Sequence, residues 1–140
     1  MKRTITEILD SIDKLKGKKI KLAELKKEAE VNPELMYILE INFDYQERGF
    51  KGLPKGIPDG YKPNHTAMPG YADATIAGIY KKLYVYSEPN ISDSRKLQLF
   101  IQDIEDLDPE EANILILAKD HTLSYKYPWI KEDAFKLIFN

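Results

Sequence analysis

Apolar residues recur along this chain at spacings of three and four, the period of a helix that buries one face. The first stripe lies near the amino end and consists of Ile5, Ile8, Leu9, Ile12 and Leu15. Thr4 and Glu7 stand at capping-box spacing before it, and Gly17 is a suitable residue to end it. The pattern therefore predicts an amphipathic helix that stops at Gly17.

The same period and several start signals predict further helices. An N-cap residue followed by Pro opens two of them, at Asn32-Pro33 and at Asp108-Pro109, and Ser92 can cap another. The predicted ranges are 22–30, 33–43, 71–86, 92–107, 109–119 and 131–138.

Residues 123–129 are the one place where alternation suggests a strand, because Tyr125, Tyr127 and Trp129 occupy every second position. Pro128 cannot donate to a ladder, so an extended aromatic tail is the better prediction. With no pair of strong strands, the predicted fold is all-α: a compact bundle of six or seven short helices in a single domain of residues 1–140.

Residues 46–70 interrupt the helical pattern with a long loop. They hold five of the seven Gly and four of the eight Pro, and this composition disfavours helix and strand. The segment also contains Phe50, Leu53, Ile57 and Tyr61. We therefore expect an ordered loop that packs across the helical body through these side chains, and loops of this length are often functional.

Charge is nearly balanced over the whole chain, with 21 basic and 23 acidic residues and a net charge of −2. A dedicated DNA-binding domain is usually basic. The basic residues nevertheless gather at 14–27, and only three of the 21 are Arg, the residue best suited to phosphate and base-edge recognition. The Lys cluster is thus expected first of all to be a solvated surface.

Composition excludes several classes of protein. There is no Cys, which removes disulfides, Cys-ligated zinc and a thiol nucleophile. The longest wholly apolar run, 114–118, is far shorter than the roughly 20 residues of a membrane span. Residues 1–7 lack the apolar stretch of a secretory signal. The expectation is a cytoplasmic protein with no membrane partner.

The known catalytic and metal-binding motifs do not fit this chain. His65 and His121 do not have a zinc-binding spacing. An EF-hand loop that begins at Asp106 would need Gly and Glu where Glu111 and Leu117 stand. The chain also has neither a phosphate-binding loop nor a Gly-x-Ser-x-Gly elbow. We expect no catalytic residues, no metal and no cofactor, and hence a protein that is not an enzyme.

Several short motifs follow one another in an order that is informative as a whole. They are Asn32-Pro33-Glu34-Leu35, the segment 53–64, Leu83-Tyr84-Val85-Tyr86, the segment 105–112 and Ala118-Lys119-Asp120. This order resembles a family of small proteins encoded by T-even-like tailed phages, including those of marine cyanobacteria, from Ile8 to Phe139.

The resemblance implies a phage origin and expression in the cytoplasm of an infected bacterial host. It implies no activity and carries no catalytic residues over. The chain departs from the family's usual Leu-Pro-Glu-Gly-x-Pro-x-Tyr pattern, because Lys55 replaces the Glu and Asp59-Gly60 add one residue before Tyr61.

Surplus tyrosine and the long loop favour a binding function. Tyr and Trp are enriched in protein interfaces, so the leading hypothesis is a phage accessory protein that binds a host or phage protein. Its candidate residues are Lys55, Tyr61 and Lys62 in the loop, Glu105, Asp106 and Glu110 at an acidic edge, and Trp129. The alternative is a nucleic-acid-associated protein that uses Lys14, Lys18, Lys19, Lys21, Tyr80 and Tyr84.

Overall fold

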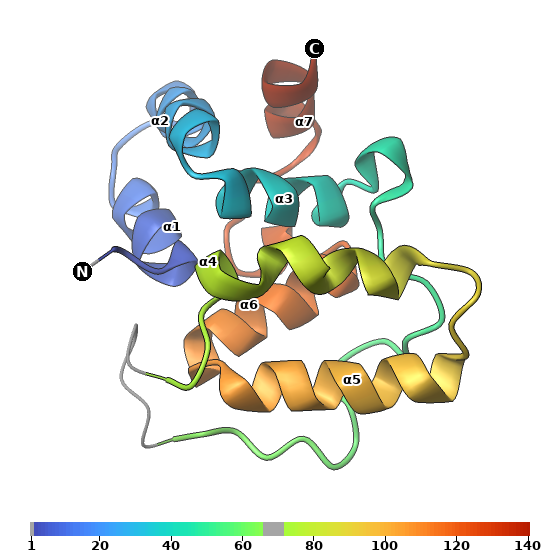
Figure 1. The fold of residues 1–140 in the computed structure, drawn as a ribbon. Helices are drawn as coiled ribbons and strands as arrows, with labels where there is room; N and C mark the ends of the chain where they lie inside the picture. The colour runs from blue at the N-terminus through green and yellow to red at the C-terminus, as the bar shows by residue number, and fades with distance from the viewer. Residues whose placement is uncertain (1, 66–71) are drawn as a thin grey trace.

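The structure is a computed structural model that describes residues 2–65 and 72–140, and these residues form helices and loops with no strand (Figure 1). The α-helices are α1 (Ile5–Asp13), α2 (Lys18–Val31), α3 (Pro33–Asn42), α4 (Ile76–Ile79), α5 (Asp93–Asp106), α6 (Pro109–Lys119) and α7 (Glu132–Phe139). Short 3₁₀ helices are η1 (Tyr45–Glu47), η2 (Tyr80–Ser87) and η3 (Leu123–Tyr125). The predicted all-α fold class is confirmed.

Three of the predicted helix starts are capped as their sequences indicate. Thr4 and Glu7 form the reciprocal capping box of α1, the Ser92 hydroxyl accepts from the backbone of α5, and Asp108 accepts from two N–H groups of α6. Asn32 differs. Its side-chain amide donates to the Glu28 carbonyl at 2.8 Å, so it closes the end of α2 instead of capping α3.

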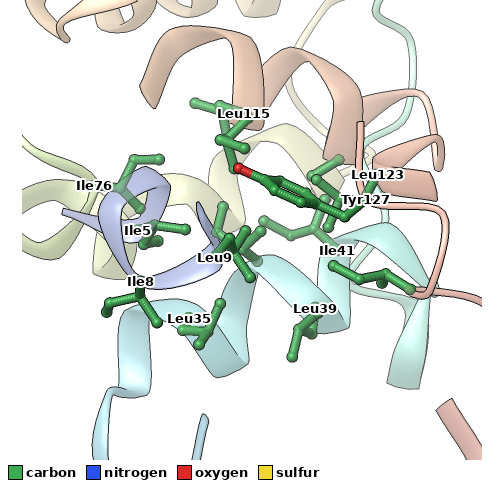
Figure 2. Packing of buried hydrophobic residues seen from close by; sticks show 14 of the residues in the cluster. Ile5, Ile8, Leu9, Leu35, Leu39, Ile41, Ile76, Leu115, Leu123 and Tyr127 are labelled. Carbon is green, nitrogen blue, oxygen red and sulfur yellow. The ribbon is translucent and has the colours of Figure 1, made fainter. Parts of the chain in front are cut away.

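The core lies where α3 and α6 meet, with α1 packed against α6 and α2. Figure 2 shows the ring of Tyr127 among Leu9, Leu115 and Leu123, and each of these side chains is at most 1% exposed. The Tyr127 hydroxyl reaches the surface of the core and donates to Asp10 Oδ1 at 2.6 Å. The segment 123–129 was predicted to be an extended aromatic tail, and instead it begins with η3 and buries Tyr127 and Trp129, while Tyr125 is 80% exposed.

The segment 71–86 was predicted to be one α-helix, and for its described residues this is wrong. α4 has only four residues, and 3₁₀ helix follows from Tyr80 to Ser87. A 3₁₀ helix has three residues per turn, so side chains three apart share a face. Leu83 and Tyr86 are both fully buried and Tyr80 packs against the core. These three residues are spaced three apart, as the geometry of a 3₁₀ helix requires.

The first two helices also differ from their predicted limits. α1 ends at Asp13, before Gly17, and α2 begins at Lys18. Gly17 has φ 98° and directly precedes α2, a backbone conformation that residues with a side chain rarely adopt.

A buried carboxylate joins the starts of three helices. Glu111 lies in the first turn of α6 and is 1% exposed. One of its oxygens accepts from Ile5 N at 3.1 Å and the other from Ile76 N at 2.9 Å. These N–H groups open α1 and α4 and have no partner within their own helices, so a single side chain fixes both helices against α6.

Burial raises the pKa of Glu111 to about 6, against 4.5 for an ordinary Glu. The two N–H donors favour the charged form and oppose this shift, whereas the nearby acids Asp108 and Glu34 add to it. Between these two pH values the folded state therefore binds more protons than the unfolded state.

We expect the free energy of unfolding to fall as pH rises from 4.5 through 6, by about 2 kcal/mol from this group. Glu111→Gln removes the titration and should lose that slope, as measured by urea unfolding between pH 4 and 7. The exposed neighbour variant Glu110→Gln is the control and should keep it. Equal slopes for the wild type and Glu111→Gln would contradict the prediction.

Candidate functional site

The long loop leaves η1 through a backbone segment of unusual conformation. Asp44, Gln46 and Glu47 have positive φ values of 51°, 50° and 63°, a region that is uncommon for residues with a side chain. The Asp44 carboxylate accepts from Gly49 N at 2.8 Å. A Cβ on Gly49 would lie 2.6 Å from Asp44 Oδ1 and 2.9 Å from a ring carbon of His121, so only glycine fits here.

The loop then packs on the body through an aromatic contact. The Phe50 ring lies 4.9 Å from that of Tyr86 and 6.1 Å from that of Phe100, centroid to centroid. Phe50 is buried, and Leu53 and Tyr61 are half-buried against the core. Of the four side chains predicted to pack, Ile57 does not, because it is 67% exposed.

Two buried lysines hold the loop by its carbonyl groups. Lys119 Nζ donates to the carbonyl oxygens of Pro54 at 2.6 Å and Gly56 at 3.1 Å, and to Asp120 Oδ1 at 2.6 Å. The other oxygen of Asp120 accepts from Gly56 N at 2.8 Å. Lys96, 2% exposed, donates to the Lys51 carbonyl at 3.0 Å. Residues 51–56 of the loop therefore have a fixed position beside α5 and α6 (Figure 1).

Ile57 lines two neighbouring hollows over α6. One hollow has a volume of about 180 Å³ and includes Tyr61 in its wall. The other, of about 430 Å³, includes Lys55 and Tyr125, a side chain that is 80% exposed. Ile57, Asn113 and Ile116 line both hollows. We call this pair of hollows the loop groove.

The structure brings together several residues of the leading hypothesis. Glu105 Oε2 accepts from Lys62 N at 2.8 Å, which fastens the loop to the end of α5. The pKa of the Tyr61 hydroxyl is raised by burial first, and then by the negative charges of Glu105 and Asp108. Glu110 is exposed in the first turn of α6, and Asp106 is half-buried and accepts through its carbonyl from Ala74 N.

Trp129 lies elsewhere, among residues of the alternative hypothesis. It is 7% exposed, and its indole N–H donates to Asp13 Oδ1 at 2.7 Å. With Lys18 and Lys21 it lines a hollow of about 460 Å³. Lys18 is paired with Asp133 at 2.6 Å and Lys21 with Asp13 at 3.8 Å, so both cations have an acidic neighbour. Lys14 and Lys19 are exposed.

The tyrosines of the alternative hypothesis are on a different element from its lysines. Tyr80 on η2 packs edge-on against Tyr37, with 5.9 Å between ring centroids. The Arg48 guanidinium covers the same Tyr37 ring at 4.8 Å. Tyr84 is 52% exposed. Of the two rings that were candidates for base stacking, Tyr80 thus already packs against another ring of the chain, and Tyr84 is the exposed one.

The titratable side chains do not form a metal-binding cluster in the part of the chain that the structure describes. Within residues 2–65 and 72–140 no group of three or more His, Asp or Glu side chains could hold a metal ion. No helix in the same ranges is long and apolar enough to cross a membrane. His121 Nδ1 lies 2.8 Å from the Asn42 carbonyl oxygen, and His65 borders the smaller hollow of the loop groove.

The sequence analysis missed Lys119, Asp120 and Lys96. Lys119 looked like an ordinary basic residue in the last turn of a helix, where it suits the helix dipole. The burial of Lys119 could have been predicted from its position directly after the apolar run 114–118. A helix with so wide an apolar face buries more than one side, including the residues next to that run.

Comparison with known families gives one match. Residues 8–125 match the sequence model of DUF6433, which is described as a family of unknown function. The searches against curated proteins and against solved structures found no match. The matched range includes the whole described part of the loop, both loop-holding lysines and Glu111.

We expect Lys119→Met to release the loop while the helices stay folded. The carbonyls of Pro54 and Gly56 lose their donor, and water can replace it only partly, so stability should fall by about 1–3 kcal/mol. Trypsin should cut after Lys51 and Lys55 about tenfold faster than in the wild type. The exposed variant Lys19→Met is the control. An unchanged rate of cutting in Lys119→Met would show that the clamp does not hold the loop.

Proposed function

The chain belongs to DUF6433, a family of unknown function, and we propose that it acts without catalysis, by binding another protein through the loop groove. The observation that carries the proposal is the exposure of Ile57. This large apolar side chain is 67% exposed, although the loop that carries it is held in place by buried lysines. A fixed backbone lowers the entropic cost of binding, because the loop need not be ordered when the partner arrives.

Exposed Tyr125 supports the same placement. Its side chain is 80% exposed and lines the larger hollow together with Lys55 and Ile57. Tyr is enriched among the residues that dominate binding energy in protein interfaces. Ile57 and Tyr125 thus give the larger hollow two large exposed side chains.

A structural role for the buried titratable groups also supports a protein that is not an enzyme. Glu111 accepts from the first N–H groups of two helices, Asp108 caps α6, and Lys119 holds the loop. Groups with a perturbed pKa mark active sites only as a matter of probability, since structural networks perturb pKa values too. Here each of these groups has a defined bonding role in the fold.

The likeness in motif order to proteins of T-even-like tailed phages makes the proposal more specific. We propose that the chain is a phage accessory protein, present in the cytoplasm of the infected bacterial host, and that its partner is a host or phage protein. A nucleic-acid-associated role that uses Lys14–Lys21 and Tyr84 is the competing hypothesis.

Affinity capture from infected host cells tests the proposal directly. We expect the tagged wild-type protein to retain a stoichiometric protein partner after nuclease treatment, as read by mass spectrometry. Ile57→Ser should reduce the captured amount about tenfold, because loss of a central apolar contact removes over 1 kcal/mol of binding energy.

Val31→Ser is the matched control for that experiment. Val31 is 70% exposed and ends α2, and α2 lies at the upper left of Figure 1, whereas residues 52–65 run along the bottom. This variant should capture the partner at the wild-type level. Equal loss in both variants, or no protein partner at all, would contradict the proposed function.

The competing hypothesis makes a different prediction, on salt. Binding that depends on several Lys–phosphate contacts must weaken steeply between about 50 and 200 mM salt. If capture disappears with nuclease, and gel shifts with single-stranded and duplex DNA or RNA are lost over this salt range, the Lys cluster is the functional surface and the loop groove is not.

A further inference from the structure

The two hollows of the loop groove form one continuous track along α6. They share Ile57, Asn113 and Ile116, and they extend from Pro109 at one end to Asp120 at the other. Eleven residues of α-helix span about 16 Å, which equals the length of about five residues of extended chain. The track is therefore long enough for a short extended peptide, and narrower than a surface for a folded domain.

The smaller hollow is suited to one apolar side chain. Its walls include Ile57, Tyr61, Pro63 and Ile116, and its volume is about 180 Å³. A cavity of about 150 Å³ lined by apolar side chains holds a benzene molecule. A Leu, Met or Phe side chain would thus fill the hollow and remove it from water.

Negative charge lies beside the Pro109 end of the track. The Glu105 carboxylate accepts from Lys62 N, between Tyr61 and Pro63 in the wall of the smaller hollow, and Asp108 directly precedes Pro109. The raised pKa of Tyr61, caused by burial and then by Glu105 and Asp108, fits a negative potential inside this hollow. A partner with positive charge next to its apolar side chain complements this end.

Asn113 supplies polar groups in the middle of the track. It is exposed, it lines both hollows, and it forms no hydrogen bond with the residues that the structure describes. A side-chain amide offers donors and an acceptor, which match the N–H and C=O groups of an extended backbone.

We propose that the loop groove binds an extended segment of the partner protein that places an apolar side chain in the smaller hollow and a Lys or Arg beside Glu105. The inference rests on the proposed protein-binding function and specifies the chemistry of the partner. The basic residue fixes the direction of the segment, because the carboxylate at the other end of the groove, Asp120, is already paired with Lys119.

Selection from a random peptide library with the full-length chain as bait tests this. We expect the selected peptides to share an apolar residue with Lys or Arg next to it. One selected peptide is then labelled and titrated by fluorescence polarisation. Replacing its Lys and Arg by Glu should weaken binding at least tenfold, because the charge reversal turns attraction to the acidic end into repulsion.

Variants of the chain locate the contacts. Ile57→Ser should weaken binding of the labelled peptide about tenfold, and Glu105→Gln about threefold. The side-chain amide oxygen that Glu105→Gln introduces can still accept from Lys62 N, so the loop stays fastened. Val31→Ser and Glu30→Gln, both on α2, are the matched controls and should bind as the wild type does.

The outcomes separate this inference from the proposed function. Peptides without basic residues, or binding that changes less than twofold in Ile57→Ser and in Glu105→Gln, would overturn the inference. A library that yields no binder would overturn it as well. The capture of a whole partner protein judges the proposed function independently, because it does not depend on the chemistry of a short segment.

Discussion

The buried carboxylate of Glu111 determines how α1 and α4 meet α6. Glu111 accepts from the first N–H groups of α1 and α4 while it lies in the first turn of α6. Removal of this acceptor would leave two backbone donors without a partner in a dry interior, which costs more than a typical hydrogen bond contributes. α4 leads directly into η2, so the position of η2 depends on the same contact.

The loop groove depends in turn on a second buried charge. Lys119 is 5% exposed and satisfies its ammonium group with two loop carbonyls and Asp120. A buried cation must be fully bonded, since its desolvation is expensive. This requirement selects one loop conformation and keeps Ile57 above α6. The shape of the loop groove thus depends on the buried ammonium group of Lys119.

Local signals in the sequence were sufficient for most of the helices and insufficient for the candidate site. The caps at Thr4, Ser92 and Asp108 act within a few residues, so their consequences could be read from the chain directly. Trp129 was grouped with the loop and lies beside Lys18 instead. Its position is set by contacts with residues distant in the sequence, such as Asp13. The spacing of residue types along the chain does not predict such contacts.

The same bond that organises the fold also sets when the fold can form. Ile5 and Glu111 are 106 positions apart, and Asp10 and Tyr127 are 117 apart. A ribosome adds about 5–20 residues per second, so α1 waits roughly 5–20 s for the acceptor that secures its first turn. Before that, α1 can pack only on elements made earlier, such as α2, and the part of its apolar face that α6 covers stays exposed. The chain therefore completes this part of its core only after Glu111 and Tyr127 have been made, and the nascent α1 needs protection until then.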